Sequence, residues 1–61
     1  MFSVNDHGSV VLIEPHTMDV LAWLRGHAQE DAQWFGMALV VEPRYVDSLV
    51  TALIQEGFAA Q

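Results

Sequence analysis

The sequence predicts a small α/β or α+β domain built as a two-layer β-α-β-α unit with two similar strand–helix halves. Three observations predict this fold: an internal repeat, two apolar runs with strand character, and a helical spacing of apolar residues after each run. The 61 residues are enough for one domain with a modest hydrophobic core. We therefore expect a single domain over residues 1–61, with halves at about 9–28 and 37–57 joined by a loop at 29–36.

The internal repeat pairs Val10–Ala22 with Ala38–Val50 at an offset of 28 residues and without a gap. Four of the thirteen paired positions are identical, and six more exchange one apolar residue for another. Each copy consists of an apolar run, a Glu-Pro pair and a helix-like segment. Unrelated strand-to-helix junctions favour the same residues, so the match leaves open whether the halves arose by duplication.

The two apolar runs, Val10–Ile13 and Met37–Val41, are rich in β-branched and aliphatic residues. They are continuous rather than alternating, which is typical of strands covered on both faces. Proline closely follows each run. Because proline cannot donate a ladder hydrogen bond but fits the first turn of a helix, we expect Pro15 and Pro43 to end strands and open helices.

The second helix has the clearer pattern, because its apolar residues form a complete i, i+3, i+4, i+7, i+8 stripe. Gly57 then provides a C-terminal cap, and Phe58 is placed to fold back on the last turn. The first helix, at about Thr17–Ala28, is less regular, since Gly26 interrupts it at a cost of roughly 1 kcal/mol relative to alanine. The two expected stripes are Val46, Leu49, Val50, Leu53 and Ile54 in the second helix, and Met18, Leu21, Leu24 and Ala28 in the first.

The remaining segments connect or extend these halves. Gln29–Gly36 is polar and then aromatic, and we expect it to be the loop that returns the chain to the second strand. Met1–Val4 and Phe58–Ala60 are each suited to a short edge strand. A sheet of two strands does not cover itself, so the fold requires such terminal strands or a second copy of the chain.

The charge balance limits the classes of partner. Eight acidic residues against two arginines give a net charge of -6, and binding to nucleic acid or anionic lipid requires basic residues that the chain lacks. No apolar stretch approaches the roughly 18 residues of a membrane span, and no leader pattern is present. The absence of cysteine agrees with a reducing compartment. We expect a cytoplasmic protein with no direct nucleic-acid or membrane partner.

The repeat also places Glu14 and Glu42 at equivalent points, with His16 and Arg44 two residues later. In parallel strands about 4.8 Å apart, the two carboxylates would face each other at the edge where ligands gather in open α/β sheets. Such a pair could bind a small ligand or divalent cation, or act in acid–base chemistry. The stronger alternative is that each glutamate merely favours a helix N-terminus through its charge. Antiparallel strands would separate the two carboxylates.

Other chemistry-bearing residues form no recognisable motif. The histidines, His7, His16 and His27, match no zinc-ligand spacing, and the serines and glycines belong to no nucleophile elbow or phosphate-binding loop. We therefore assign no catalytic, metal-binding or cofactor-binding residue, expect no cofactor, and regard enzymatic activity as open but disfavoured.

The aromatic residues Trp23, Trp34 and Phe35 carry much of the area that a small chain has to bury. Tryptophan is enriched at the centre of protein interfaces. Two interpretations remain open: Trp34 and Phe35 cover the end of the sheet as part of the core, or they form an exposed binding patch. A dimer would cover the surplus apolar surface in either case.

The block from Asp31 to Tyr45, DAQWFGMALVVEPRY, resembles a segment found in a group of short bacterial proteins without assigned function. The likeness covers about a quarter of the chain directly. It implies a small protein of bacterial or mobile-element origin, and it transfers no catalytic residue to any position.

These observations favour a non-enzymatic, self-associating module that contacts another protein through its aromatic and acidic surface. One alternative is a ligand-binding or metal-binding protein, or a minor enzyme, that uses the Glu14–Glu42 pair with His16 and Arg44. Another is an acidic mimic of nucleic acid that binds a DNA-binding protein, which the even spread of carboxylates along the chain disfavours.

Overall fold

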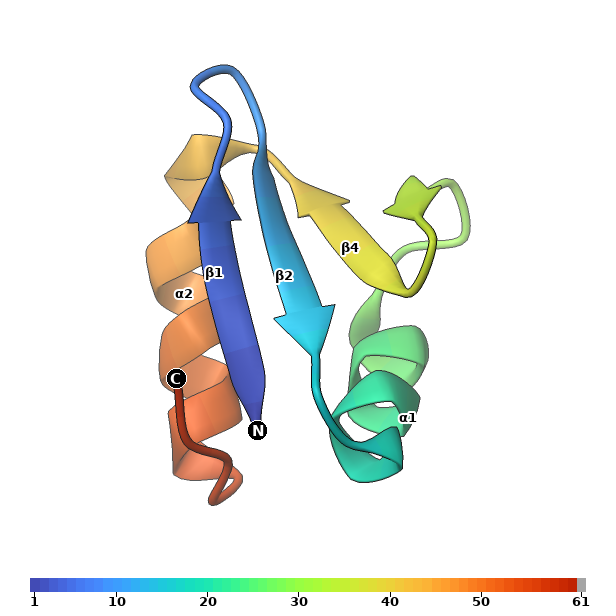
Figure 1. Ribbon diagram of the computed structural model, residues 1–61, viewed down its shortest axis with the longest axis vertical. Helices are drawn as coiled ribbons and strands as arrows, with labels where there is room; N and C mark the ends of the chain where they lie inside the picture. Colours follow the sequence, from blue (N-terminus) through green and yellow to red (C-terminus); the bar gives the residue numbers. More distant parts are fainter. Residues whose placement is uncertain (61) are drawn as a thin grey trace.

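The computed structural model describes residues 1–60 and confirms a small α+β fold. Four antiparallel strands form one sheet in the order β1-β2-β4-β3, and both helices pack on the same face of it (Figure 1). The elements in chain order are β1 Phe2–Asp6, β2 Val11–Pro15, α1 Met18–His27, β3 Trp34–Phe35, β4 Ala38–Val41 and α2 Pro43–Gln55.

The register of the two central strands follows the repeat. β2 and β4 run antiparallel, with Val11 opposite Val41 and Leu12 opposite Val40. Leu12 and Val40 are also equivalent residues at the offset of 28. The middle pair of the ladder therefore lies on a local twofold axis that relates the halves of the domain.

The outer elements obey the same symmetry. The pairing of β3 with β4 repeats that of β1 with β2 at this offset. The hairpin turns contain Gly8 and Gly36, with φ of 85° and 61°, where glycine avoids the steric cost that other residues pay. The helices end at His27 and Gln55, again 28 residues apart. The repeating structural unit is thus ββα rather than the expected strand–helix pair.

The prediction of a continuous loop over residues 29–36 is wrong for its aromatic part. Trp34–Phe35 forms the edge strand β3, which pairs with β4 and runs parallel to β2. Helix α1 therefore connects two parallel strands, as a β-α-β unit does, but those strands are β2 and β3. β4 lies between them and runs in the opposite direction.

The apolar core lies between the sheet and the helices. Burial alternates along β2, where Val11 and Ile13 are buried and Leu12 is only half-buried. The expectation that both faces of the apolar runs are covered is therefore wrong, because two short helices cover one face only. The core residues buried in this layer are Phe2, Val11, Ile13, Val20, Leu24, Leu39, Val41 and Leu53.

Helix α1 begins and ends near the expected residues, but its buried face differs. The hydroxyl of Thr17 accepts a hydrogen bond from the backbone N–H of Val20 at 3.3 Å and caps the helix. Pro15 closes β2 instead of opening this helix. The face toward the sheet is formed by Val20, Leu21 and Leu24, which leaves Met18 exposed at the first turn.

Helix α2 confirms the expected start and cap. Pro43 occupies the first turn, and Gly57 follows the helix with φ of 99°. The N–H of Gly57 donates to the carbonyl of Ile54, and that of Phe58 to the carbonyl of Leu53, which is the Schellman arrangement. Phe58 packs against the core as expected. The last residue of the predicted stripe, Ile54, is exposed instead.

The chain ends meet at the outer edge of β1. The N–H of Phe2 donates to the carbonyl of Ala59 at 3.3 Å, and Phe2 forms an isolated parallel bridge with Ala60. Both expected terminal strands thus have a counterpart: β1 is a full edge strand, and Phe58–Ala60 contributes that single bridge.

The two glycines of the helical segments give a paired test of this fold. Gly57→Ala should lower the free energy of unfolding by about 1 kcal/mol, because its positive φ strains any side chain. Gly26→Ala should raise it by up to about 1 kcal/mol, because Gly26 lies inside α1 with open space around its Cα. Urea denaturation of both variants measures the difference. Equal effects of the same sign would contradict the positions of the two residues.

Candidate interaction surfaces

Within residues 1–60, no helix lies over the face of the sheet opposite the core. The strand register pairs Ser3 with Glu14, and it pairs Leu12 with both Asn5 and Val40, so these side chains project to the uncovered side. Phe35 joins them opposite Ala38. We call this surface the open face; it comprises Ser3, Asn5, Leu12, Glu14, Phe35, Met37, Ala38 and Val40.

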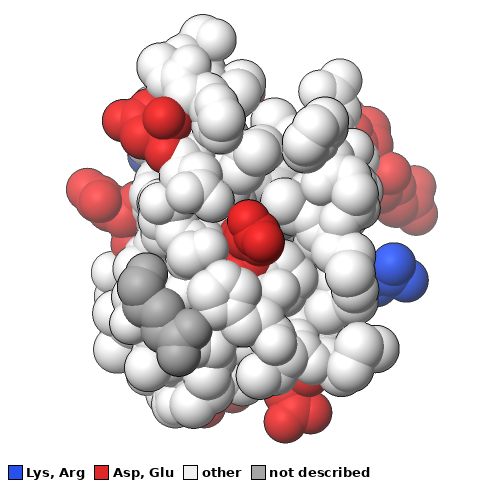
Figure 2. Space-filling view, viewed as in Figure 1, with Lys and Arg blue, Asp and Glu red and all other residues white. Residues whose placement is uncertain are grey.

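Apolar side chains dominate one end of the open face. Phe35 is 73% exposed and Met37 is 54% exposed. They line a shallow hollow of about 760 Å³ together with Leu12 and Ala38, and its polar lining includes Asp6, His7 and Glu14. Figure 2 shows the molecule from the side of the sheet. One acidic group lies near the middle of this view, and the other charged groups that can be seen lie around the margin. An apolar surface with a charged surround is the usual anatomy of a protein interface.

The polar residues of the open face form side-chain contacts with neighbouring polar residues. The side-chain amide of Asn5 donates to Oε2 of Glu14 at 3.4 Å. Oγ of Ser3 lies 3.1 Å from Nε2 of His16, within hydrogen-bonding distance. Glu14 is the acidic residue among those that define the open face, and its hydrogen bond from Asn5 is long.

The antiparallel register separates the carboxylates that parallel strands would have paired. Glu14 follows Ile13 toward one end of the β2–β4 ladder, whereas Glu42 follows Val41 at the other end. Along the strands they are offset by four residues, or roughly 14 Å at about 3.4 Å per residue. His16 lies near Ser3 and Arg44 near Glu42, so the four residues divide between two ends of the sheet. The hypothesis that Glu14 and Glu42 form a shared carboxylate site is therefore wrong.

Glu42 and Arg44 instead form a local surface pair. Glu42 is the N-cap residue of α2, although its side chain makes no capping hydrogen bond. Its Oε2 lies 3.1 Å from Nε of Arg44, and both side chains are well exposed. The guanidinium also lies 4.8 Å from the ring centroid of Tyr45. Exposed pairs of this kind contribute little to stability.

The three aromatic residues do not form one patch. Trp34 and Phe35 point to opposite faces of β3 because successive side chains alternate along a strand. Trp34 packs against the core, whereas Phe35 stands exposed on the open face. Trp34 thus covers the core and Phe35 is exposed, so neither interpretation applies to both residues.

Trp23 belongs to a second surface, between the helices. Its ring stacks on that of His27, with centroids 3.9 Å apart and an angle of 16° between the planes. Nδ1 of His27 lies 2.8 Å from the carbonyl oxygen of Trp23, which fixes the position of the imidazole. Nε1 of Trp23 is buried and has no hydrogen-bond partner within residues 1–60, at a cost of about 1–3 kcal/mol.

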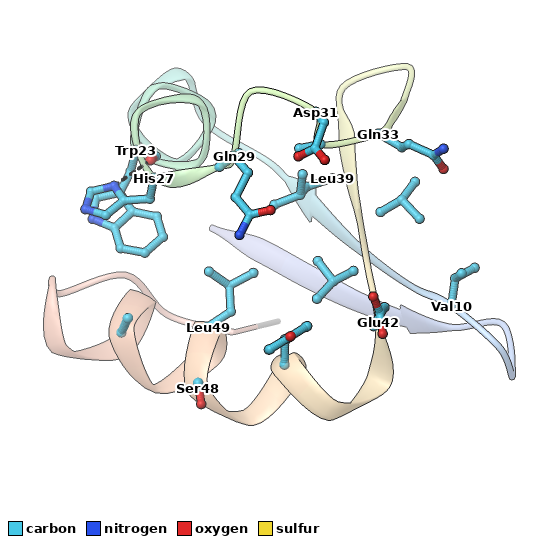
Figure 3. Close-up of a pocket in the computed structure, with 16 residues that line it drawn as sticks. Val10, Trp23, His27, Gln29, Asp31, Gln33, Leu39, Glu42, Ser48 and Leu49 are labelled. Carbon is cyan, nitrogen blue, oxygen red and sulfur yellow. Dashed lines mark hydrogen bonds between the residues drawn. The ribbon is translucent and has the colours of Figure 1, made fainter.

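The space between α1 and α2 is a groove of about 740 Å³, here called the interhelical groove. In Figure 3, Trp23 and His27 lie at one end of it and Val10 and Glu42 at the other. Leu39 and Leu49 lie between these ends. The segment that follows α1 contributes Gln29, Asp31 and Gln33 to its border.

Some residues of these surfaces were not identified by sequence reasoning. Met37, Leu12 and Val40 lie within the apolar runs and were expected in a doubly covered sheet. Leu12 and Glu14 lie two residues apart on β2, and Ser3 and Asn5 lie two residues apart on β1. This spacing is the sequence signal that these residues share a solvent-facing side of the sheet.

No protein-family model, curated protein or solved structure matches the chain. Within residues 1–60, no group of three or more histidine, aspartate or glutamate side chains is arranged to hold a metal ion. In the part of the chain that the structure describes, neither helix has the length and apolar character to cross a membrane.

Substitution of the neighbouring aromatic residues tests their placement. Trp34→Ala should lower the free energy of unfolding by about 1–3 kcal/mol, because Trp34 packs on the core. Phe35→Ala should change it by less than about 0.5 kcal/mol, because most of this side chain is exposed. Thermal unfolding at low protein concentration measures both values. A larger loss for Phe35→Ala would contradict the assignment of faces.

Proposed function

We propose that the protein is a small, non-enzymatic interaction module that associates with a second copy of itself through the open face. The observation that carries the proposal is the uncovered apolar surface around Phe35 and Met37. Covering apolar surface contributes about 25 cal/mol per Å². Two sheets pack face to face about 10 Å apart when their inner faces are apolar.

The edges of the sheet favour stacking of faces over addition of strands. The outer edge of β1 is occupied near Phe2 by the segment around Ala59. At the opposite edge, β3 is only two residues long. An edge strand that recruits another strand has to offer a longer row of free backbone groups. The open face is therefore the larger surface available to a second copy.

The size of the face indicates a weak dimer. The molecule measures 27 × 20 × 17 Å, so face-to-face contact covers roughly 500 Å² per copy, near the lower limit for specific interfaces. Each copy also has a net charge of -6, which opposes association. Added salt screens this repulsion over a Debye length of about 10 Å at 0.1 M. We expect an affinity in the range of tens of micromolar that increases with salt.

Two methionine substitutions test the face with matched chemistry. Met37→Glu places a charge in the apolar part of the open face, whereas Met18→Glu places the same charge at the exposed start of α1. Sedimentation at about 100 µM should find dimers for the unmodified chain and for Met18→Glu, and monomers for Met37→Glu. A strictly monomeric unmodified chain, or equal effects of the two substitutions, would refute the proposed surface.

Substitution of Glu14, the carboxylate of the open face, should strengthen dimerisation rather than weaken it. Face-to-face contact removes water from Glu14, whose carboxylate accepts a long hydrogen bond from Asn5. Glu14→Gln keeps the shape and removes the charge, so we expect dimerisation to strengthen at least about threefold. Asp47→Asn is the matched control, because it removes a charge from the exposed surface of α2. Sedimentation equilibrium of both variants decides whether the gain is specific to Glu14.

A further inference from the structure

The interhelical groove differs from the open face in its chemistry. Its floor and walls are largely apolar, with Leu39 from β4, Leu49 from α2 and Trp23 from α1. Its border carries the carboxylates of Asp31 and Glu42, and neither arginine of the chain lines it. The groove is thus an apolar trough with an acidic border.

The position of the groove also favours a peptide occupant. It lies between two helices on the covered side of the sheet, where a further chain segment would complete the helical layer (Figures 1 and 3). Binding of an amphipathic segment in an apolar groove uses a few anchoring side chains at helical spacing. Lysine or arginine beside these anchors would meet Asp31, and would compete with Arg44 for Glu42.

We infer that the interhelical groove binds a short basic amphipathic segment of another protein, with its apolar side chains between α1 and α2. Apolar contact with Trp23 and Leu49 supplies affinity, while the acidic border and the net charge of -6 select a basic partner. The inference uses the opposite side of the sheet from the self-association surface and does not depend on that proposal.

The salt dependence separates the two interactions. Binding of a cationic segment to an acidic protein weakens as salt screens the attraction, whereas self-association of two acidic copies strengthens. Peptide binding is expected to persist in the monomeric Met37→Glu variant, because Met37 does not line the groove. Failure of one interaction therefore leaves the other measurable.

The probe is a fluorescein-labelled peptide of about 14 leucine and lysine residues, with the leucines spaced for one face of a helix. The control peptide has the same composition in an order that breaks this spacing. Fluorescence anisotropy should give an affinity at least about tenfold weaker for the control peptide, because apolar anchoring requires the leucines to share one face. Equal affinities would indicate adhesion by charge alone and would overturn the inference.

Two arginine substitutions on α2 locate the binding surface. Ser48 lines the groove and Thr51 does not, and both are exposed. Ser48→Arg should weaken peptide binding at least about tenfold, because it places a bulky cation in the groove. Thr51→Arg makes the same change in net charge outside the groove and should weaken binding less than about threefold. Equal losses, or no loss with Ser48→Arg, would overturn the inference.

A pair of double variants tests the acidic border in the same way. Asp31→Asn with Glu42→Gln removes two charges from the border of the groove. Glu42 makes no capping hydrogen bond, and the ion pair with Arg44 that this change removes is exposed and contributes little to stability. Asp47→Asn with Glu56→Gln removes two charges elsewhere. The first pair should weaken peptide binding at least about fivefold more than the second. Equal effects would show that only net charge matters and would refute a groove that selects its partner.

Discussion

The antiparallel pairing of β2 with β4 determines the rest of the structure. Its central pair, Leu12 and Val40, lies on the local twofold axis, and each strand leads into a helix on the same side of the sheet. Because side chains alternate along a strand, the same register sends Val11, Ile13, Leu39 and Val41 to the core. Leu12 and Val40 then face the uncovered side. The core and the open face are two consequences of one ladder.

The size of the chain explains why one face stays uncovered. Two helices of ten and thirteen residues span one side of a four-stranded sheet and leave a groove between them. A chain of about 60 residues buries only about 60% of the surface that it exposes when unfolded. The apolar residues that exceed this capacity lie on two surfaces, the open face around Phe35 and the interhelical groove around Trp23. We propose that both are interaction surfaces, the first for a second copy and the second for a basic segment.

Sequence reasoning predicted the features that depend on local chemistry. The start of α2 at Pro43 and the cap formed by Gly57 and Phe58 both follow from backbone constraints that act within a few residues. The repeat also identified equivalent positions correctly, since the register obeys its offset of 28 residues.

The features that depend on tertiary contacts were not predictable in the same way. Strand β3 is two residues long, and within its polar and aromatic segment nothing distinguishes it from a loop. Yet this short strand lets α1 connect β2 to β3, so that β4 returns antiparallel between them. The candidate site at Glu14 and Glu42 depended on that direction. The expected cover on both faces has a different cause, because the two helices cover one face only.

Interstrand nuclear Overhauser effects between the backbone protons of β2 and β4 test the central claim most directly. The antiparallel register requires contacts that join Val11 to Val41 and Ile13 to Leu39. A parallel arrangement at the same offset would instead join Val11 to Leu39 and Ile13 to Val41. We expect the first set and not the second. The second set would contradict the twofold arrangement, the open face and the separation of Glu14 from Glu42.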